Sequence, residues 1–104
     1  MRLSDEQISA IVSTIREHTN PHHVNIYLYG SRVNPNLKGG DIDLLIVADE
    51  VAKSSIDQKI FKLLNEIKKS ASIGDRRIDL KIATESELKS DPFLINIAKT
   101  MKKI

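Results

Sequence analysis

The segment DIDLLIV, residues 41–47, places two carboxylates at the entrance of a strongly apolar strand. Asp41 and Asp43 are two residues apart, so their side chains emerge on the same face of a strand. Two neighbouring anions repel each other, and each resists ionisation unless a cation compensates for the charge. Because carboxylate oxygens suit magnesium, this spacing predicts a Mg²⁺ site.

A third carboxylate, Asp79, lies on the polar face of the strand predicted for RRIDLKIA, residues 76–83. If the two strands are neighbours, the three carboxylates converge. Such a cluster can hold one or two magnesium ions for an in-line displacement at phosphorus. Two simpler interpretations stay open. Asp-x-Asp can cap the preceding Lys-Gly-Gly turn, and Asp79 can form a surface ion pair with Arg77 or Lys81.

Gly30, Ser31 and Arg32, which precede the Asp-x-Asp motif, could bind the phosphates of a nucleotide. Gly30 has no Cβ, so the backbone can approach a ligand closely there. Ser31 offers a hydroxyl, with nearby backbone amides, to phosphate oxygens, and Arg32 can add a charge-assisted contact. Gly-Ser can equally form an ordinary turn, and Arg32 can be a solvated side chain. Together with the carboxylates, however, the pattern predicts a metal–nucleotide site, in which metal charge and in-line positioning stabilise the transition state of phosphoryl transfer.

The combined motif resembles the signature of a known family. LYGSRVNPNLKGGDIDLLIV, residues 28–47, is similar to the Gly-Ser, loop and Asp-x-Asp of minimal nucleotidyltransferases in the DNA polymerase β superfamily, and Asp79 matches their third acid. The resemblance covers about residues 24–83. It implies that Mg²⁺ and the catalysis depend on Asp41, Asp43 and Asp79, and that the nucleotide binds at Gly30, Ser31 and Arg32.

The loop between the two parts of the motif departs from the family. The sequence has VNPN at residues 33–36, where relatives often carry small residues with a glycine, and Gly40 where many have serine. These differences concern the geometry of the loop more than the chemistry, since all three acids remain.

The resemblance also implies a reaction and a partner. Small stand-alone members often pair with helical HEPN-domain proteins in prokaryotic toxin–antitoxin modules, where they neutralise the HEPN ribonuclease by transferring AMP from ATP to it or by binding it. The implied function is thus a Mg²⁺-dependent nucleotidyltransferase that modifies a protein hydroxyl, such as that of a tyrosine, and acts as an antitoxin. The alternative is a weak or inactive module that acts by binding alone. A small-molecule acceptor is a third possibility.

Alternating and helical hydrophobic patterns predict the elements that position these residues. Strands are expected at residues 24–29, 41–47 and 76–83. Capping boxes predict one helix from Ser4 with Gln7, ending at Asn20-Pro21, and a long one from Ser55 with Gln58, with an apolar stripe over residues 56–67.

Near the C-terminus, Thr84 with Glu87 predicts another helical turn, Asp91-Pro92 predicts a last helix, and KTMKKI, residues 99–104, is expected to be a solvated helix end. The predicted fold is α+β, the nucleotidyltransferase fold. It is a small mixed sheet in α-β-α-β-α-β-α order, with helices mainly on one face and polar residues on the other.

Length and composition limit the remaining possibilities. The 104 residues fit a single domain, residues 1–104, and the net charge of +2 gives no support for a dedicated nucleic-acid or membrane surface. The absence of cysteine excludes disulfides and thiolate metal sites, and with no signal-peptide pattern we expect a cytoplasmic protein. A small core with an incomplete site leaves a homo-oligomer or a heterocomplex open.

Overall fold

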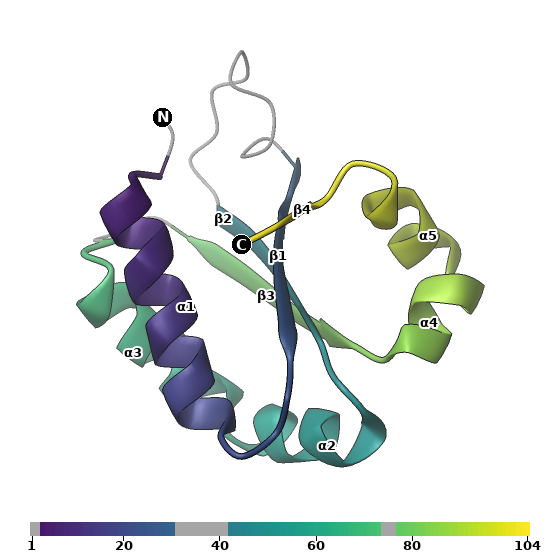
Figure 1. Ribbon diagram of the computed structural model, residues 1–104, viewed down its shortest axis with the longest axis horizontal. Helices are drawn as coiled ribbons and strands as arrows, with labels where there is room; N and C mark the ends of the chain where they lie inside the picture. Colours follow the sequence, from purple (N-terminus) through teal and green to yellow (C-terminus); the bar gives the residue numbers. More distant parts are fainter. Residues whose placement is uncertain (1–2, 31–41, 74–76) are drawn as a thin grey trace.

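A computed structural model of the chain describes residues 3–30, 42–73 and 77–104. Its centre is a four-stranded sheet in the order β3-β2-β1-β4 (Figure 1). The strands are β1 Asn25–Tyr29, β2 Ile42–Val47, β3 Ile78–Ala83 and β4 Lys102–Lys103. β2 runs antiparallel to β1 and parallel to β3, while β4 runs antiparallel to β1. The α+β fold with a small mixed sheet, predicted from the sequence, is confirmed. The helix expected between the first two strands falls on residues 31–41, outside the described ranges, and the strand β4 was not part of the predicted order.

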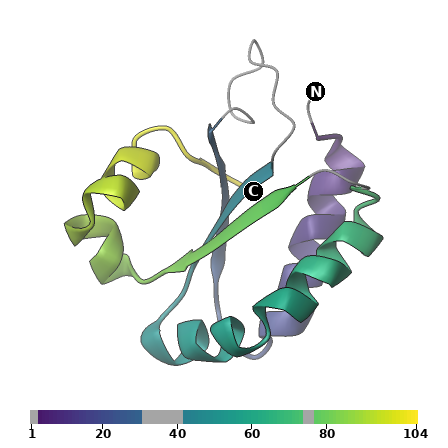
Figure 2. The same ribbon diagram turned by 180° about the vertical axis from the view of Figure 1, so that it is seen from behind.

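Helices cover both faces of the sheet, but unequally. Helices α1 (Asp5–Thr19), α2 (Glu50–Gln58) and α3 (Ile60–Ser70) lie on one side, and the short helices α4 (Glu85–Ser90) and α5 (Pro92–Ala98) lie on the other (Figures 1 and 2). The connection between the parallel strands β2 and β3 passes through α2 and α3, the helical crossover that parallel pairing requires.

Strand alternation explains this division of the core. Successive side chains point to opposite faces of a strand, and one set of alternating positions joins the larger cluster under α1, α2 and α3. Its strand members are Ile26, Leu28, Ile42, Leu44, Ile46, Ile78 and Leu80. The other face, expected to be polar, also carries a smaller apolar cluster with α5. That second cluster contains Tyr29, Leu45, Val47, Ala83, Leu94 and Ile97.

All the predicted helix starts but one are confirmed. The boxes at Ser4 and Thr84 are both formed, and Pro92 begins α5. The long helix predicted from Ser55 is wrong. Asp49 caps α2 instead, because its Oδ1 accepts from the backbone N–H of Ala52 at 2.7 Å, and Ser55 lies inside that helix. The helical stretch is then interrupted at Lys59, so it forms two helices rather than one.

The solvated helix end predicted for residues 99–104 is also wrong. Lys102 and Lys103 form the edge strand β4 against Leu28 and Tyr27, and the N–H of Ile104 donates to the Ile26 carbonyl at 2.9 Å. The reason is long-range: the outer edge of β1 presents backbone groups that need partners, and the segment after α5 supplies them. None of the helices in the described ranges is long and apolar enough to cross a membrane.

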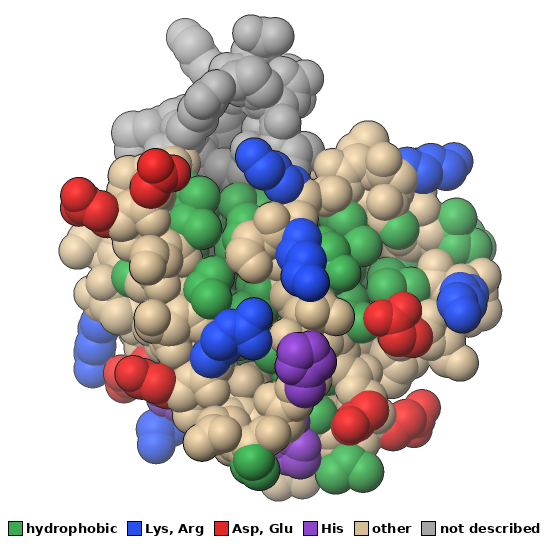
Figure 3. Space-filling model, in the orientation of Figure 1, with side chains coloured by type: hydrophobic (Ala, Val, Ile, Leu, Met, Phe, Trp, Pro, Cys, Tyr) green, Lys and Arg blue, Asp and Glu red, His purple; other side chains and the backbone are tan. Residues whose placement is uncertain are grey.

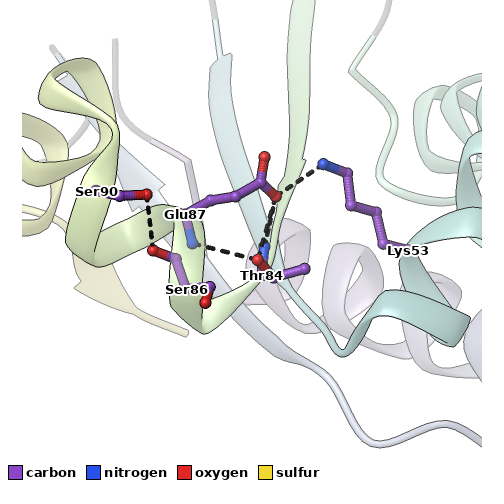
Figure 4. A network of polar contacts seen from close by, with 5 residues as sticks. All are labelled: Lys53, Thr84, Ser86, Glu87 and Ser90. Carbon is purple, nitrogen blue, oxygen red and sulfur yellow. Dashed lines mark hydrogen bonds and ion pairs between the residues drawn. The ribbon is translucent and has the colours of Figure 1, made fainter.

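A polar network ties α2 to the start of α4 (Figure 4). Glu87 Oε1 accepts from Lys53 Nζ at 2.8 Å and from the backbone N–H of Thr84 at 3.0 Å. The bond from Lys53 is the main cause that lowers the pKa of Glu87, and the same bond raises the pKa of Lys53. The capping glutamate of α4 therefore also holds the crossover beside β3.

Glu87→Gln should keep the capping contact and lose the ion pair. We expect a loss of less than about 1 kcal/mol in the free energy of unfolding at neutral pH, as for other solvent-accessible pairs. The pKa of Glu87 is lower in the folded state, so its contribution is present above the ordinary value of 4.5 and is lost as the pH falls below it. Urea unfolding at pH 7 and pH 3 measures both effects. Glu85→Gln, an exposed position of α4, is the control. If the difference between Glu87→Gln and the wild-type chain does not shrink between pH 7 and pH 3, the assignment is contradicted.

Candidate active site

Three polar side chains lie in one row across the sheet. Tyr29 of β1 is paired in register with Asp43 of β2, which is paired in register with Asp79 of β3. Strands alternate their side chains, and Ile42, Leu44, Ile78 and Leu80 point into the larger core, so the three members of this row share the opposite face. The sequence-based condition that the strands of Asp43 and Asp79 be neighbours is confirmed. We refer to Tyr29, Asp43 and Asp79 as the carboxylate row.

The sheet holds the two carboxylates close to each other. Adjacent strands are about 4.8 Å apart, and like charges directly opposite each other destabilise a sheet. Both residues are only half-buried, although apolar residues flank them along β2 and β3. Such a pair is unfavourable by itself and favours the binding of a cation.

One ammonium group already lies beside the pair. Lys81 Nζ is 3.8 Å from Asp79 Oδ2, which is the surface ion pair that the sequence left open as the simpler interpretation. The same Nζ lies 5.3 Å from the centre of the Phe93 ring in α5. Because both Asp79 and Lys81 are solvent-accessible, this ion pair contributes little to stability and can be exchanged for another partner.

Gly30 makes room for the Asp43 carboxylate. It directly follows β1 and has a φ of +73°, a left-handed conformation that side chains rarely adopt. A Cβ at this position would lie 2.6 Å from Asp43 Oδ2. The sequence predicted that this glycine lets the backbone approach a phosphate, whereas the geometry shows that it lets the backbone approach a carboxylate of the site.

The structure brings together three of the predicted site residues: Gly30, Asp43 and Asp79. Ser31, Arg32 and Asp41 lie outside the described residues. Within the ranges that are described, no group of three or more His, Cys, Asp or Glu side chains could hold a metal ion. Asp43 and Asp79 nevertheless supply the hard oxygen donors that Mg²⁺ prefers, and the space left by Gly30 admits one of them.

The sequence pattern gave Tyr29 no role in the site. Its side chain is 7% exposed, and its hydroxyl has no hydrogen-bond partner within 3.5 Å in the described part of the chain. Burial raises the pKa of the Tyr29 phenol, and the nearby carboxylates of Asp79 and Asp43 raise it further. The one available signal was its position directly before Gly30 on the face shared with Asp43.

Known proteins share both the sequence pattern and the fold. The chain matches the nucleotidyltransferase domain over residues 7–104. A search of curated proteins gave no match. A solved structure of a putative nucleotidyltransferase from Sulfolobus solfataricus superposes with a TM-score of 0.54 at 17% identity, covering 95% of this chain and 82% of that one, which supports the fold alone.

A second solved structure is spectinomycin adenyltransferase AAD(9) from Enterococcus faecialis, determined with ATP and spectinomycin. It superposes with a TM-score of 0.51 at 31% identity and covers 82% of this chain. The chain spans only 36% of the length of that protein.

Proposed function

The chain belongs to the nucleotidyltransferase domain family, and on that premise we propose that it transfers a nucleoside monophosphate, AMP from ATP, to a hydroxyl group of a protein partner. The observation that carries the proposal is the in-register pair of Asp43 and Asp79, with Gly30 leaving room for the Asp43 carboxylate. The adenyltransferase solved with ATP supports adenylate as the transferred group.

Asp43 and Asp79 would hold Mg²⁺, with Asp41 as the third ligand that the family resemblance implies. When bound, the metal ion would supply positive charge to the phosphates in the transition state and orient them for in-line attack. In the transfer, the acceptor oxygen forms a bond to the α-phosphorus while the bond from that phosphorus to the bridging oxygen breaks. Pyrophosphate leaves, and the Asp79 carboxylate takes the proton of the acceptor hydroxyl.

A surface beside the row supports a protein as the acceptor. Phe93 and Ile95 of α5 are 54% and 39% exposed, and the Phe93 ring contacts Lys81, the ion-pair partner of Asp79. Hydrophobic side chains reach the surface on the side of α4 and α5 (Figure 3). The family resemblance points to a helical HEPN-domain protein as the partner, and the chain would then act as the antitoxin of that pair.

A second candidate acceptor is a small molecule such as an aminocyclitol. The observation in its favour is the 31% identity to the spectinomycin adenyltransferase. The match covers only 36% of that protein, so its acceptor is carried over to this chain only as a candidate.

Transfer of label from ATP decides between these functions. We expect ATP labelled at the α-phosphate, with Mg²⁺ and a co-expressed helical HEPN-domain protein, to label that protein, and EDTA to prevent it. ATP labelled at the γ-phosphate should leave the protein unlabelled, because pyrophosphate departs. Label on spectinomycin instead favours the second candidate. Absence of label on both acceptors, together with neutralisation of the partner, indicates a module that acts by binding.

A further inference from the structure

Tyr29 is the member of the carboxylate row that the proposed reaction does not use. Its ring belongs to the second apolar cluster, with Leu45 of β2 and Leu94 and Ile97 of α5. Packing from two elements therefore fixes the ring. A phenylalanine would fill the same space, so this packing does not account for the hydroxyl.

The Tyr29 hydroxyl is costly in its present environment. Burying a hydroxyl without a hydrogen-bond partner costs roughly 1–3 kcal/mol, and few buried polar groups in proteins lack a partner. No described residue provides a partner for this hydroxyl within 3.5 Å. A buried and unpartnered hydroxyl that lies against a candidate site indicates a contact that forms when the site is in use.

The Asp79 carboxylate is the group that the hydroxyl faces. Tyr29, Asp43 and Asp79 stand in one row of the sheet, and of the two carboxylates Asp79 has the stronger effect on the phenol and is the one placed to accept a hydrogen bond from it, although it lies beyond 3.5 Å. The ion-pair partner of Asp79 is the flexible and solvent-accessible Lys81, at 3.8 Å. A long, solvent-accessible lysine fixes the orientation of a carboxylate less firmly than a packed tyrosine does.

We propose that Tyr29 is a positioning residue: in the working site its hydroxyl donates a hydrogen bond to the Asp79 carboxylate and holds that acid in the row beside Asp43. This inference rests on the proposed function. A donor anchored at one carboxylate oxygen would leave the other oxygen available to a bound cation, and such hydrogen bonds to metal ligands tune metal affinity.

Tyr29→Phe tests the proposal, and Tyr27→Phe is a matched control. Tyr27 lies two residues before Tyr29 on the same face of β1, and it pairs with Leu45 rather than with a carboxylate. Titration calorimetry with Mn²⁺ alone should show an affinity about 10–100-fold weaker for Tyr29→Phe, the usual effect of losing a partner of a metal ligand, and no change for Tyr27→Phe. The temperature of unfolding of metal-free Tyr29→Phe should be unchanged or raised, since an unpartnered buried hydroxyl is removed.

The Asp79→Asn background shows whether the effect passes through Asp79. Tyr29→Phe should weaken Mn²⁺ binding in the wild-type chain and have little further effect in Asp79→Asn, a non-additivity expected of residues in contact. Equal Mn²⁺ affinity of Tyr29→Phe and Tyr27→Phe would overturn the proposal, as would a wild-type chain that binds no Mn²⁺. A wild-type chain that binds Mn²⁺ but transfers no AMP overturns the proposed function. The comparison of Tyr29→Phe with Tyr27→Phe then still tests the positioning role of Tyr29.

Discussion

Asp43→Asn is expected to reduce the transfer of label from ATP by at least about 100-fold while leaving the chain folded. The substitution keeps the shape of the side chain and removes one anionic ligand from the carboxylate row. Metal ions supply several kcal/mol of charge stabilisation in transition states, and about 1.4 kcal/mol corresponds to a tenfold change in rate. Relief of the repulsion from Asp79 should leave the free energy of unfolding unchanged or slightly increased.

Asp57→Asn is the matched control for this prediction. Asp57 is an exposed carboxylate of α2 and is not part of the carboxylate row, so the same chemical change should leave transfer unaffected. Rates of label transfer at saturating ATP and urea unfolding curves of both variants provide the measurements. If the Asp43→Asn chain transfers label as fast as the Asp57→Asn chain, Asp43 has no catalytic role. If the Asp43→Asn chain neutralises the partner without transferring label to it, the chain functions by binding alone.

Gly30→Ala is expected to damage both stability and transfer. The added Cβ would lie 2.6 Å from Asp43 Oδ2, a distance that forces the carboxylate or the backbone to shift. The φ of +73° adds roughly 1–2 kcal/mol of strain for a residue with a side chain. We expect a total loss of about 1–3 kcal/mol in the free energy of unfolding, and at least a tenfold loss of transfer because Asp43 is displaced.

Removing the Asp43 side chain separates the two causes. In an Asp43→Ala background the atom that collides is absent, so Gly30→Ala should cost less than it does in the wild-type chain, by roughly 0.5–1 kcal/mol, at the lower end of the coupling seen for residues in contact. Denaturant unfolding of the four chains of this cycle gives the coupling. An equal cost in both backgrounds would show that backbone strain alone acts at Gly30 and that its closeness to the carboxylate has no energetic weight.

Local patterns were sufficient for most of the fold. The capping boxes at Ser4 and Thr84 satisfy backbone groups within four residues, and strand alternation sorts Asp43 from Leu44 without any knowledge of the rest of the chain. The long helix failed because Ser55 and Gln58 have capping spacing inside a helix that Asp49 had already started. Two cap candidates so close together are indistinguishable by residue type alone.

The features that sequence reasoning missed all depend on distant segments. Lys102 and Lys103 carry no strand pattern, and they pair because β1 has an open edge. The burial of the Tyr29 hydroxyl depends on α5, which follows β1 by many residues. The closeness of Gly30 to Asp43 follows from the antiparallel pairing of β1 with β2. Each of these features is a tertiary property. The sequence could say only that Asp43 and Asp79 converge if their strands are neighbours, and it could not show that they are.

The crossover through α2 and α3 has a consequence for the order in which the site can assemble. β1 and β2 are consecutive strands, whereas Asp79 reaches Asp43 only after the chain between β2 and β3 has closed a longer loop, which costs more entropy. The repulsion between the two acids therefore opposes only that last closure. A cation that binds both carboxylates binds the closed chain and not the open one, so mass action makes it a stabiliser of the completed topology. The metal ion that the proposed reaction needs would therefore also stabilise the pairing of β2 with β3.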